Sequence, residues 1–190
     1  MAQDINKPFG LLAAGLYEIT DAVTPTYENK VSIPCPISLE FDREITEAEL
    51  EGGDVVCDVV VKNRNLTFTL TFGGTDLAVW AIVLGESDPT DGGSTPNAYT
   101  YIDIESTATP REFGLIAQAT NSAGGDTHII LFRCMAKEGP GGAFSQGEHL
   151  TTEFSGIGRE RPPSGTEFAR ILNHESRQAV PTAWPGTTAY

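Results

Sequence analysis

The sequence is short of basic residues. It has 12 Lys and Arg against 26 Asp and Glu in 190 residues, which gives a formal net charge of −14. A nucleic-acid-binding protein normally carries a basic patch that displaces counterions from phosphates. A peripheral membrane protein normally carries basic residues beside an apolar face. Neither pattern is present, so we expect repulsion from nucleic acid and no membrane attachment.

Cysteine and histidine are also scarce. The cysteines stand far apart, form no Cys-x-x-Cys pair, and are Cys35, Cys57 and Cys134. This argues against a disulfide framework or a zinc ribbon and favours buried free thiols in a reducing compartment. The histidines do not have a metal-binding spacing and are His128, His149 and His174. We therefore expect neither a metal nor a cofactor.

Long apolar runs are absent as well. No stretch approaches the roughly 20 residues that span a bilayer, and the short run 11–16 lacks the layout of a signal peptide. We expect synthesis in a cytoplasm. The length suits one domain with appendages.

Catalytic motifs are missing. The segment 142–147 fails the Gly-x-Ser-x-Gly spacing because position 143 is Ala, and the glycines at 73–74 lack the lysine of a phosphate-binding loop. The acidic residues at 40, 42 and 44 allow a glycosidase hypothesis, but no aromatic-lined cleft accompanies them. We expect that the protein is not an enzyme.

What the sequence has is glycine, proline and alternating segments, which are typical of all-β proteins. It contains 20 Gly and 12 Pro. We predict strands over 15–20, 31–44, 55–62, 66–72, 98–105, 113–120, 127–137 and 148–157. The predicted fold is mainly β: an antiparallel β-sandwich or incomplete barrel with one short α-helix on its flank.

Strict alternation over 66–72 separates an apolar face from a hydroxyl face, which consists of Thr67, Thr69 and Thr71. We predict a turn at 63–65 that joins this strand to 55–62 in a hairpin. In 31–44, alternation places three acidic residues on one strand face, namely Glu40, Asp42 and Glu44. We interpret residues 45–54 as an acidic loop with at most one helical turn.

A short apolar helix is predicted over 77–84, with an edge strand as the alternative because Val79, Ile82 and Val83 are β-branched. Thr75 or Asp76 can cap its start, and Gly85 is placed to end it. The expected core residues of this flank helix are Leu77, Trp80, Ala81 and Leu84.

Charge is unevenly distributed along the chain. Residues 1–95 hold 16 acidic and 5 basic residues, a net charge of −11, whereas the segment from 159 onward has four Arg against three Glu. We divide the chain into a β domain over 1–158 and an extended C-terminal arm over 159–190. The arginines expected to contact neighbouring copies are Arg159, Arg161, Arg170 and Arg177.

The order of these features resembles that of the major tail proteins of long-tailed bacteriophages, the subunits of the tail tube. An acidic strand and loop (residues 37–54) precede a strand pair (55–74), a short apolar helix (76–85) and a second set of strands through residue 157. The resemblance covers roughly residues 10–158, and the long segment after 158 departs from it.

The resemblance implies a structural virion protein that self-assembles into hexameric rings stacked as a tube. It implies a tape measure protein and a tail terminator as partners, and DNA that passes the lumen without specific binding. The candidate lumen-facing residues are the acidic set (Glu40, Asp42 and Glu44) or the hydroxyl set (Thr67, Thr69 and Thr71). The alternative is a virion decoration or carbohydrate-binding β-sandwich module.

Overall fold

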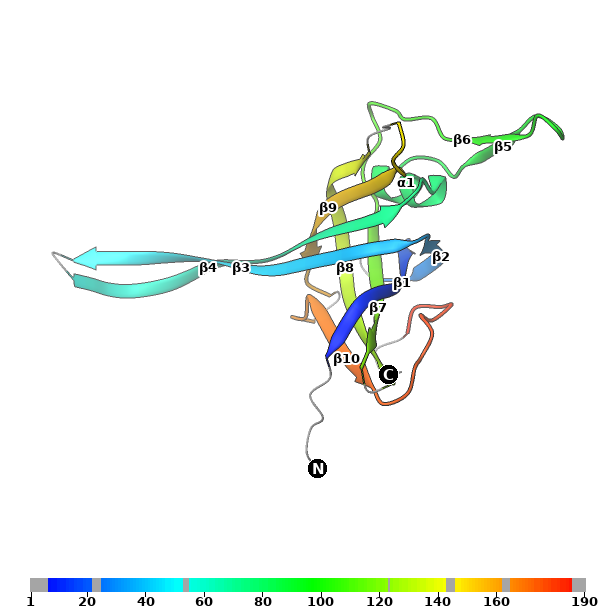
Figure 1. Cartoon of the computed structure of the whole chain (residues 1–190). Helices are drawn as coiled ribbons and strands as arrows, with labels where there is room; N and C mark the ends of the chain where they lie inside the picture. Colours follow the sequence, from blue (N-terminus) through cyan, green and yellow to red (C-terminus); the bar gives the residue numbers. More distant parts are fainter. Residues whose placement is uncertain are drawn as a thin grey trace.

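The fold was obtained as a computed structural model, shown in Figure 1. It describes residues 7–21, 25–52, 55–122, 124–142, 146–161 and 165–185, with the backbone alone for 46–52 and 55–64. Its elements are β1 (Pro8–Ile19), β2 (Tyr27–Ile33), β3 (Pro36–Gly52), β4 (Val55–Gly73), α1 (Leu77–Leu84), β5 (Thr90–Gly92), β6 (Tyr99–Tyr101), β7 (Glu112–Asn121), β8 (Asp126–Gly141), β9 (Thr151–Arg159) and β10 (Ala169–His174).

One antiparallel sheet organises the chain. Its strand order is β2-β1-β7-β8-β9-β4-β3, and β10 joins it on β8. β7 pairs along one edge of β8, while β9 and β10 share the other edge. The sheet curves without closing into a barrel, and β1 approaches β3 although four strands separate them. The predicted fold class, mainly β with one short helix, is confirmed.

The main core lies on the concave face of the sheet. Four phenylalanine rings meet there edge to face at centroid distances of 6.2–6.4 Å, and they are Phe68, Phe72, Phe113 and Phe154. Helix α1 covers this core beside β8 and β2. We call the concave side the inner face and the opposite side the outer face.

Helix α1 occupies the predicted residues. The Asp76 carboxylate accepts hydrogen bonds from the backbone N–H groups of Ala78 and Val79 at 2.9 and 3.4 Å, and Gly85 ends the helix with φ of 80°. Its burial differs in detail from the expectation: Ala81 is buried, but Leu77, Trp80 and Leu84 are half-buried. Three β-branched residues complete the buried set, namely Val79, Ile82 and Val83.

The predicted turn at 63–65 is wrong. β4 runs through this segment without a break, and its partner is β3 rather than its own second half. The register shifts between Thr46 and Glu47, opposite Asn63 and Val61, so Lys62 is an extra residue in the ladder. A β-bulge of this kind accommodates a turn-like sequence inside a continuous strand.

The prediction of an acidic loop over 45–54 is also wrong for residues 45–52. Residues 45–52 continue β3 and pair with β4, and residues 53–54 lie outside the described part. β9 pairs with β4 only over Leu66–Gly73. Residues 46–52 and 55–64 therefore form a two-stranded extension that projects from the body of the sheet (Figure 1), which we call the ribbon.

The predicted strand 31–44 is really parts of two strands. A turn at 34–35 separates β2 from β3, with Cys35 at φ of 41°. That turn leaves the Cys35 side chain exposed, contrary to the expected burial, whereas Cys134 is buried as predicted. The side chain of Cys57 lies outside the described part.

The segment assigned to an arm contains a strand that the sequence reasoning missed. β10 pairs with β8 from Ala169 opposite Leu131 to His174 opposite Asp126. Residue 158, the predicted boundary, lies within β9. No helix in the described residues is long and apolar enough to cross a membrane.

Candidate functional site

The two predicted lumen-facing sets lie on the same face of the sheet. Glu40 is directly opposite Thr69, and Asp42 is directly opposite Thr67, in the β3–β4 ladder. Residues paired in this way project to the same side of a sheet. The sequence offered these sets as alternatives, and antiparallel pairing makes them one surface on the outer face.

Strands β9 and β8 extend this surface. Thr71 pairs with Glu153 and donates a hydrogen bond from its hydroxyl to that carboxylate at 3.2 Å. Ser155 likewise pairs with Glu138 and donates to its carboxylate at 3.2 Å. We define the acidic face as Glu40, Asp42, Glu44, Thr67, Thr69, Thr71, Glu138, Glu153 and Ser155.

All five carboxylates of the acidic face belong to exposed residues, and the hydroxyl residues between them are half-buried. Lys137 lies beside Glu138 at a register shift. Acidic residues two apart on a strand are about 7 Å apart. The face is therefore a continuous anionic surface with hydrogen-bonding hydroxyl groups between its carboxylates.

Glu138 and Glu153 were not among the residues predicted from the sequence. Glu153 could have been found, because it alternates with Phe154 in the predicted strand 148–157. Glu138 had no such signal, because the register shift next to it breaks the alternation of β8.

An ion-pair cluster borders the acidic face. The row from Asp42 through Thr67 continues across β9 and β8 to Glu112 on β7. Glu112 accepts two hydrogen bonds from Arg133, at 2.7 and 2.8 Å, and one from Arg159 at 3.0 Å. Arg159 therefore has an intrachain partner.

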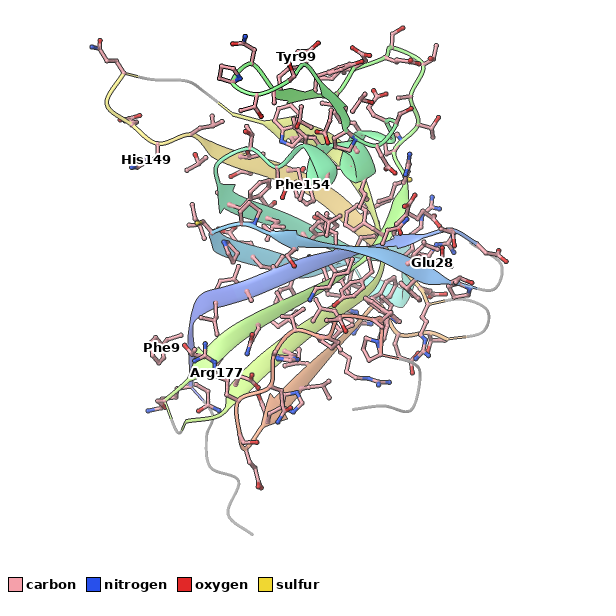
Figure 2. All side chains as sticks on the ribbon, turned by 90° about the vertical axis from the view of Figure 1, so that its right-hand side faces the viewer. Phe9, Glu28, Tyr99, His149, Phe154 and Arg177 are labelled. Carbon is pink, nitrogen blue, oxygen red and sulfur yellow. The ribbon has the colours of Figure 1, made fainter. Side chains whose placement is uncertain are left out.

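Two of the other three predicted arm arginines, Arg161 and Arg170, also have partners within the chain. The guanidinium carbons of Arg161 and Arg170 lie 4.9 and 5.4 Å from the centroid of the Phe132 ring, which is cation–π geometry. Arg177 is exposed, at the opposite end of the molecule from Tyr99 (Figure 2). The contacts described for Arg159, Arg161 and Arg170 hold the arm to its own sheet.

The arm covers a second apolar cluster on the outer face. Trp184 stacks on Tyr27 with centroids 4.0 Å apart, and meets Tyr17 edge to face at 5.1 Å. The Tyr27 hydroxyl donates to the Phe132 carbonyl at 2.8 Å, and burial raises the pKa of Tyr27 to about 12. Lys30 donates to the Val180 carbonyl at 3.0 Å. The arm therefore packs against the sheet instead of extending away from it.

A buried polar cluster lies where the arm crosses β8. Asp126 and His128 on β8 are fully buried and share the outer face with His174 at the end of β10. One ligand-type atom from each residue lies within 4.8 Å of the other two. Burial lowers the pKa of His128, against the opposing effect of Asp126. In the sequence, the spacing Asp-x-His on a predicted strand could have indicated that Asp126 and His128 share a face. Nothing indicated that His174, which lies 46 residues beyond His128, would join them.

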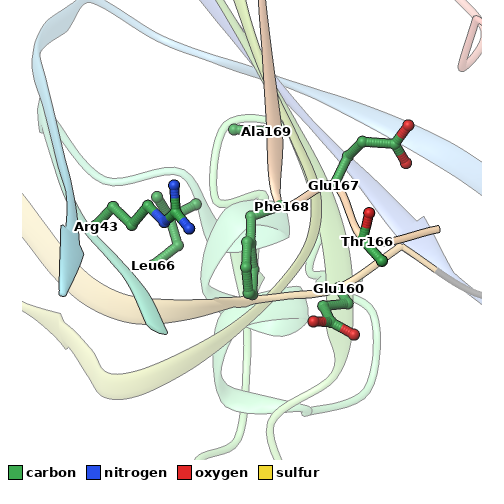
Figure 3. Close-up of a pocket in the computed structure, with 7 residues that line it drawn as sticks. All are labelled: Arg43, Leu66, Glu160, Thr166, Glu167, Phe168 and Ala169. Carbon is green, nitrogen blue, oxygen red and sulfur yellow. The ribbon is translucent and has the colours of Figure 1, made fainter. Parts of the chain in front are cut away.

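A groove separates β3 and β4 from the beginning of the arm. Arg43 and Leu66 line one side, and Phe168 faces them from the arm (Figure 3). Glu160 and Glu167 lie beyond Phe168 in the same view. The groove has acidic residues on its arm side and one arginine on its strand side.

No protein-family model matches the chain. No curated protein matches it either. Among solved structures, it is similar to a chain in the 6-fold symmetrised cryo-EM structure of the anti-feeding prophage (AFP) baseplate. The two are 12% identical, the match covers 90% of this chain and 97% of that one, and the TM-score is 0.45. Similarity at this level does not assign a function.

Proposed function

We propose that the protein is a structural subunit of a phage-type tail that polymerises into stacked rings and forms the tail tube. The acidic face lines the bore, and DNA passes along it during ejection without specific binding. The ring is a hexamer, and the protein acts as a building block rather than as an enzyme. The tape measure protein and the tail terminator are its further partners.

The observation that supports this proposal best is the continuous acidic face. Its carboxylates come from three strands, β3, β9 and β8, and β4, which lies between β3 and β9, supplies threonine hydroxyl groups. One of these hydroxyls, that of Thr71, donates a hydrogen bond to Glu153. A surface of one charge sign repels phosphates of the same sign. A wall built from this face would let DNA slide because its carboxylates repel the phosphate backbone.

The free edge of the sheet supports self-assembly. In the described residues β3 pairs only with β4, so a strand of 17 residues forms one edge of the sheet. Long edge strands offer unpaired backbone groups to another chain. A second copy that pairs there in a head-to-tail manner generates a ring when the rotation closes.

The ribbon supports stacking of subunits. A two-stranded hairpin by itself is only marginally stable in water, and its second strand has a sequence typical of covered strands. The valines in that strand are Val55, Val56, Val59, Val60 and Val61. We infer that the ribbon packs against neighbouring copies in the tube.

Negative-stain microscopy of the concentrated protein tests the proposal. The wild type should form hollow tubes. A variant in which an Asn-Gly turn joins Ile45 directly to Arg64, its cross-strand partner, should fold but remain unassembled. The matched control shortens the β5–β6 hairpin in the same way between Thr90 and Tyr101, and should still form tubes.

Two results would contradict the proposal. One is a wild type that stays monomeric at every concentration and is absent from purified tails. The other is tube formation by the variant without the ribbon. Circular dichroism of each variant separates loss of assembly from loss of folding.

One observation favours the alternative of a carbohydrate-binding module. Tyr99 and Tyr101 on β6 are exposed, with ring centroids 6.0 Å apart, in a hairpin that projects from the body (Figures 1 and 2). Exposed aromatic rings are suited to stacking against sugars. Binding on a glycan array that Tyr99→Ala abolishes would support this alternative, and absence of binding would remove it.

A further inference from the structure

We propose that Asp126, His128 and His174 bind a divalent transition-metal ion, with Zn²⁺ as the preferred ion. The site would join the C-terminal arm to the sheet. Two imidazoles and one carboxylate form a donor set that first-row divalent metals accept with positions left open for water.

The backbone brings these three side chains together. Asp126 and His128 are two residues apart on β8, so both project to the outer face. His174 is directly opposite Asp126 in the β8–β10 ladder and therefore projects to the same side. The two imidazole centroids lie 4.7 Å apart. Nε2 of His128 lies 3.4 Å from Oδ2 of Asp126 and 3.1 Å from the backbone carbonyl oxygen of Gln178, and a metal ion at Nε2 would replace the second contact.

The carboxylate is oriented by neighbouring donors. Oδ2 of Asp126 accepts from the side-chain amide of Gln118 at 2.6 Å and from the backbone N–H of Gln178 at 2.8 Å. Its other oxygen, Oδ1, is buried and accepts no hydrogen bond. A buried carboxylate oxygen without a donor is costly, and a cation would satisfy it. Outer-shell donors that fix a ligand in this way are typical of metal sites.

The cluster must contract to bind zinc. Zinc bonds to nitrogen and oxygen are about 2.0–2.2 Å long, so the ligand atoms of a tetrahedral zinc site lie about 3.4 Å apart. In this cluster the corresponding atoms of the three residues lie up to 4.8 Å apart. Asp126 and His128 are fully buried and held by the sheet. His174 is half-buried at the end of β10, so its side chain is the one that can move.

Metal binding would fasten the arm. His174 ends β10, and Gln178, four residues later, already hydrogen-bonds to Asp126 through its backbone N–H. A metal ion bound to both β8 and His174 would hold the segment that includes the exposed Arg177. The arm should then resist proteolysis more strongly with metal than without it.

Cobalt and zinc titrations test this site on the full chain. Chelator-treated protein should develop visible d–d absorption with Co²⁺, and Zn²⁺ should displace the Co²⁺ and raise the melting temperature. His174→Gln and His128→Gln should weaken Zn²⁺ binding by more than about a hundredfold, since even outer-shell changes cost 10- to 100-fold. The matched control is His149→Gln, because His149 is exposed and outside the cluster.

A second readout is tryptic cleavage after Arg177, which Zn²⁺ should slow in the wild type and in His149→Gln but not in His174→Gln. His174 is half-buried, so the His174→Gln variant is expected to fold. This holds even if variants of the fully buried Asp126 fail to fold. The proposal is overturned if the wild type shows neither the cobalt spectrum nor a zinc-dependent melting temperature. It is also overturned if the His128 and His174 variants bind as tightly as the wild type, or if His149→Gln abolishes binding.

Discussion

Replacing Gly114 by alanine should detach the C-terminal arm. Gly114 lies on β7 beneath Trp184, and a Cβ atom added there would be 2.4 Å from Cζ3 and 2.6 Å from Cη2 of the indole. It would also be 3.0 Å from Cε1 of Tyr27. These distances are shorter than van der Waals contact, so the indole must leave its stacked position on Tyr27.

The expected destabilisation is about 2 kcal/mol. Overpacking a well-packed site costs about 1–3 kcal/mol, and removing a buried tryptophan altogether costs about 3–5 kcal/mol. Trp184 is half-buried, so the free-energy cost of displacing it should fall in the range of about 1–3 kcal/mol rather than in that of about 3–5 kcal/mol. Loss of the stacked contact with Tyr27 and the edge contact with Tyr17 accounts for the effect.

Urea unfolding and the rate of tryptic cleavage after Arg177 measure this effect. Gly141→Ala is the matched control, because Gly141 also lies in a strand of the sheet and an added Cβ would meet nothing within 4 Å. The control should change stability by no more than about 0.5 kcal/mol and leave cleavage unchanged. Equal stability and equal cleavage in the two variants would refute the docked position of the arm.

Other predictions concern the helix cap, the thiols and alkaline pH. Asp76→Ala should lower the free energy of unfolding in urea by about 1 kcal/mol because it removes the cap of α1, and an unchanged value would contradict that role. Iodoacetamide should modify the exposed Cys35 and spare Cys134, whose burial also raises its thiol pKa; equal labelling in a peptide mass map would contradict the packing. Because the folded-state pKa of Tyr27 is about 12 against an ordinary 10.0, its neutral form stabilises the fold below pH 10, and this contribution is lost between pH 10 and 12. Near-UV circular dichroism should follow that loss, and Tyr27→Phe should remove this part of the pH dependence.

Local signals were sufficient for some elements. Asp76 and Gly85 stand at the two ends of an apolar octet, and each satisfies helix-end backbone groups by short-range geometry. The alternation of Thr67, Thr69 and Thr71 with apolar neighbours defined two faces of a strand. These features depend on adjacent residues, so the sequence was enough to predict them.

Long-range pairing could not be predicted in the same way. Asn63-Arg64-Asn65 has the composition of a turn, and only the pairing of β4 with β3 shows that it lies within a continuous strand. The placement of Glu40 opposite Thr69 likewise depends on register. Turn and bulge chemistry overlap, so the single sequence could not decide between them.

The buried cluster was missed for a related reason. Asp126 and His128 are close in sequence, but His174 reaches them only because β10 pairs with β8 in one register. A spacing of 46 residues has no recognisable metal-binding pattern. The apolar residues of the arm gave a weaker signal still, since Trp184 lies in a short segment that contains proline and glycine and shows no strand or helix alternation.

A cryo-EM map of the assembled tube would show which face of the subunit lines the bore. We expect a ring in which the strands bearing Glu40, Asp42 and Glu153 surround the bore, with their carboxylates facing it. We also expect the ribbon of each copy to pack against neighbouring copies. A map in which the acidic face lies on the outer wall of the tube would contradict the account.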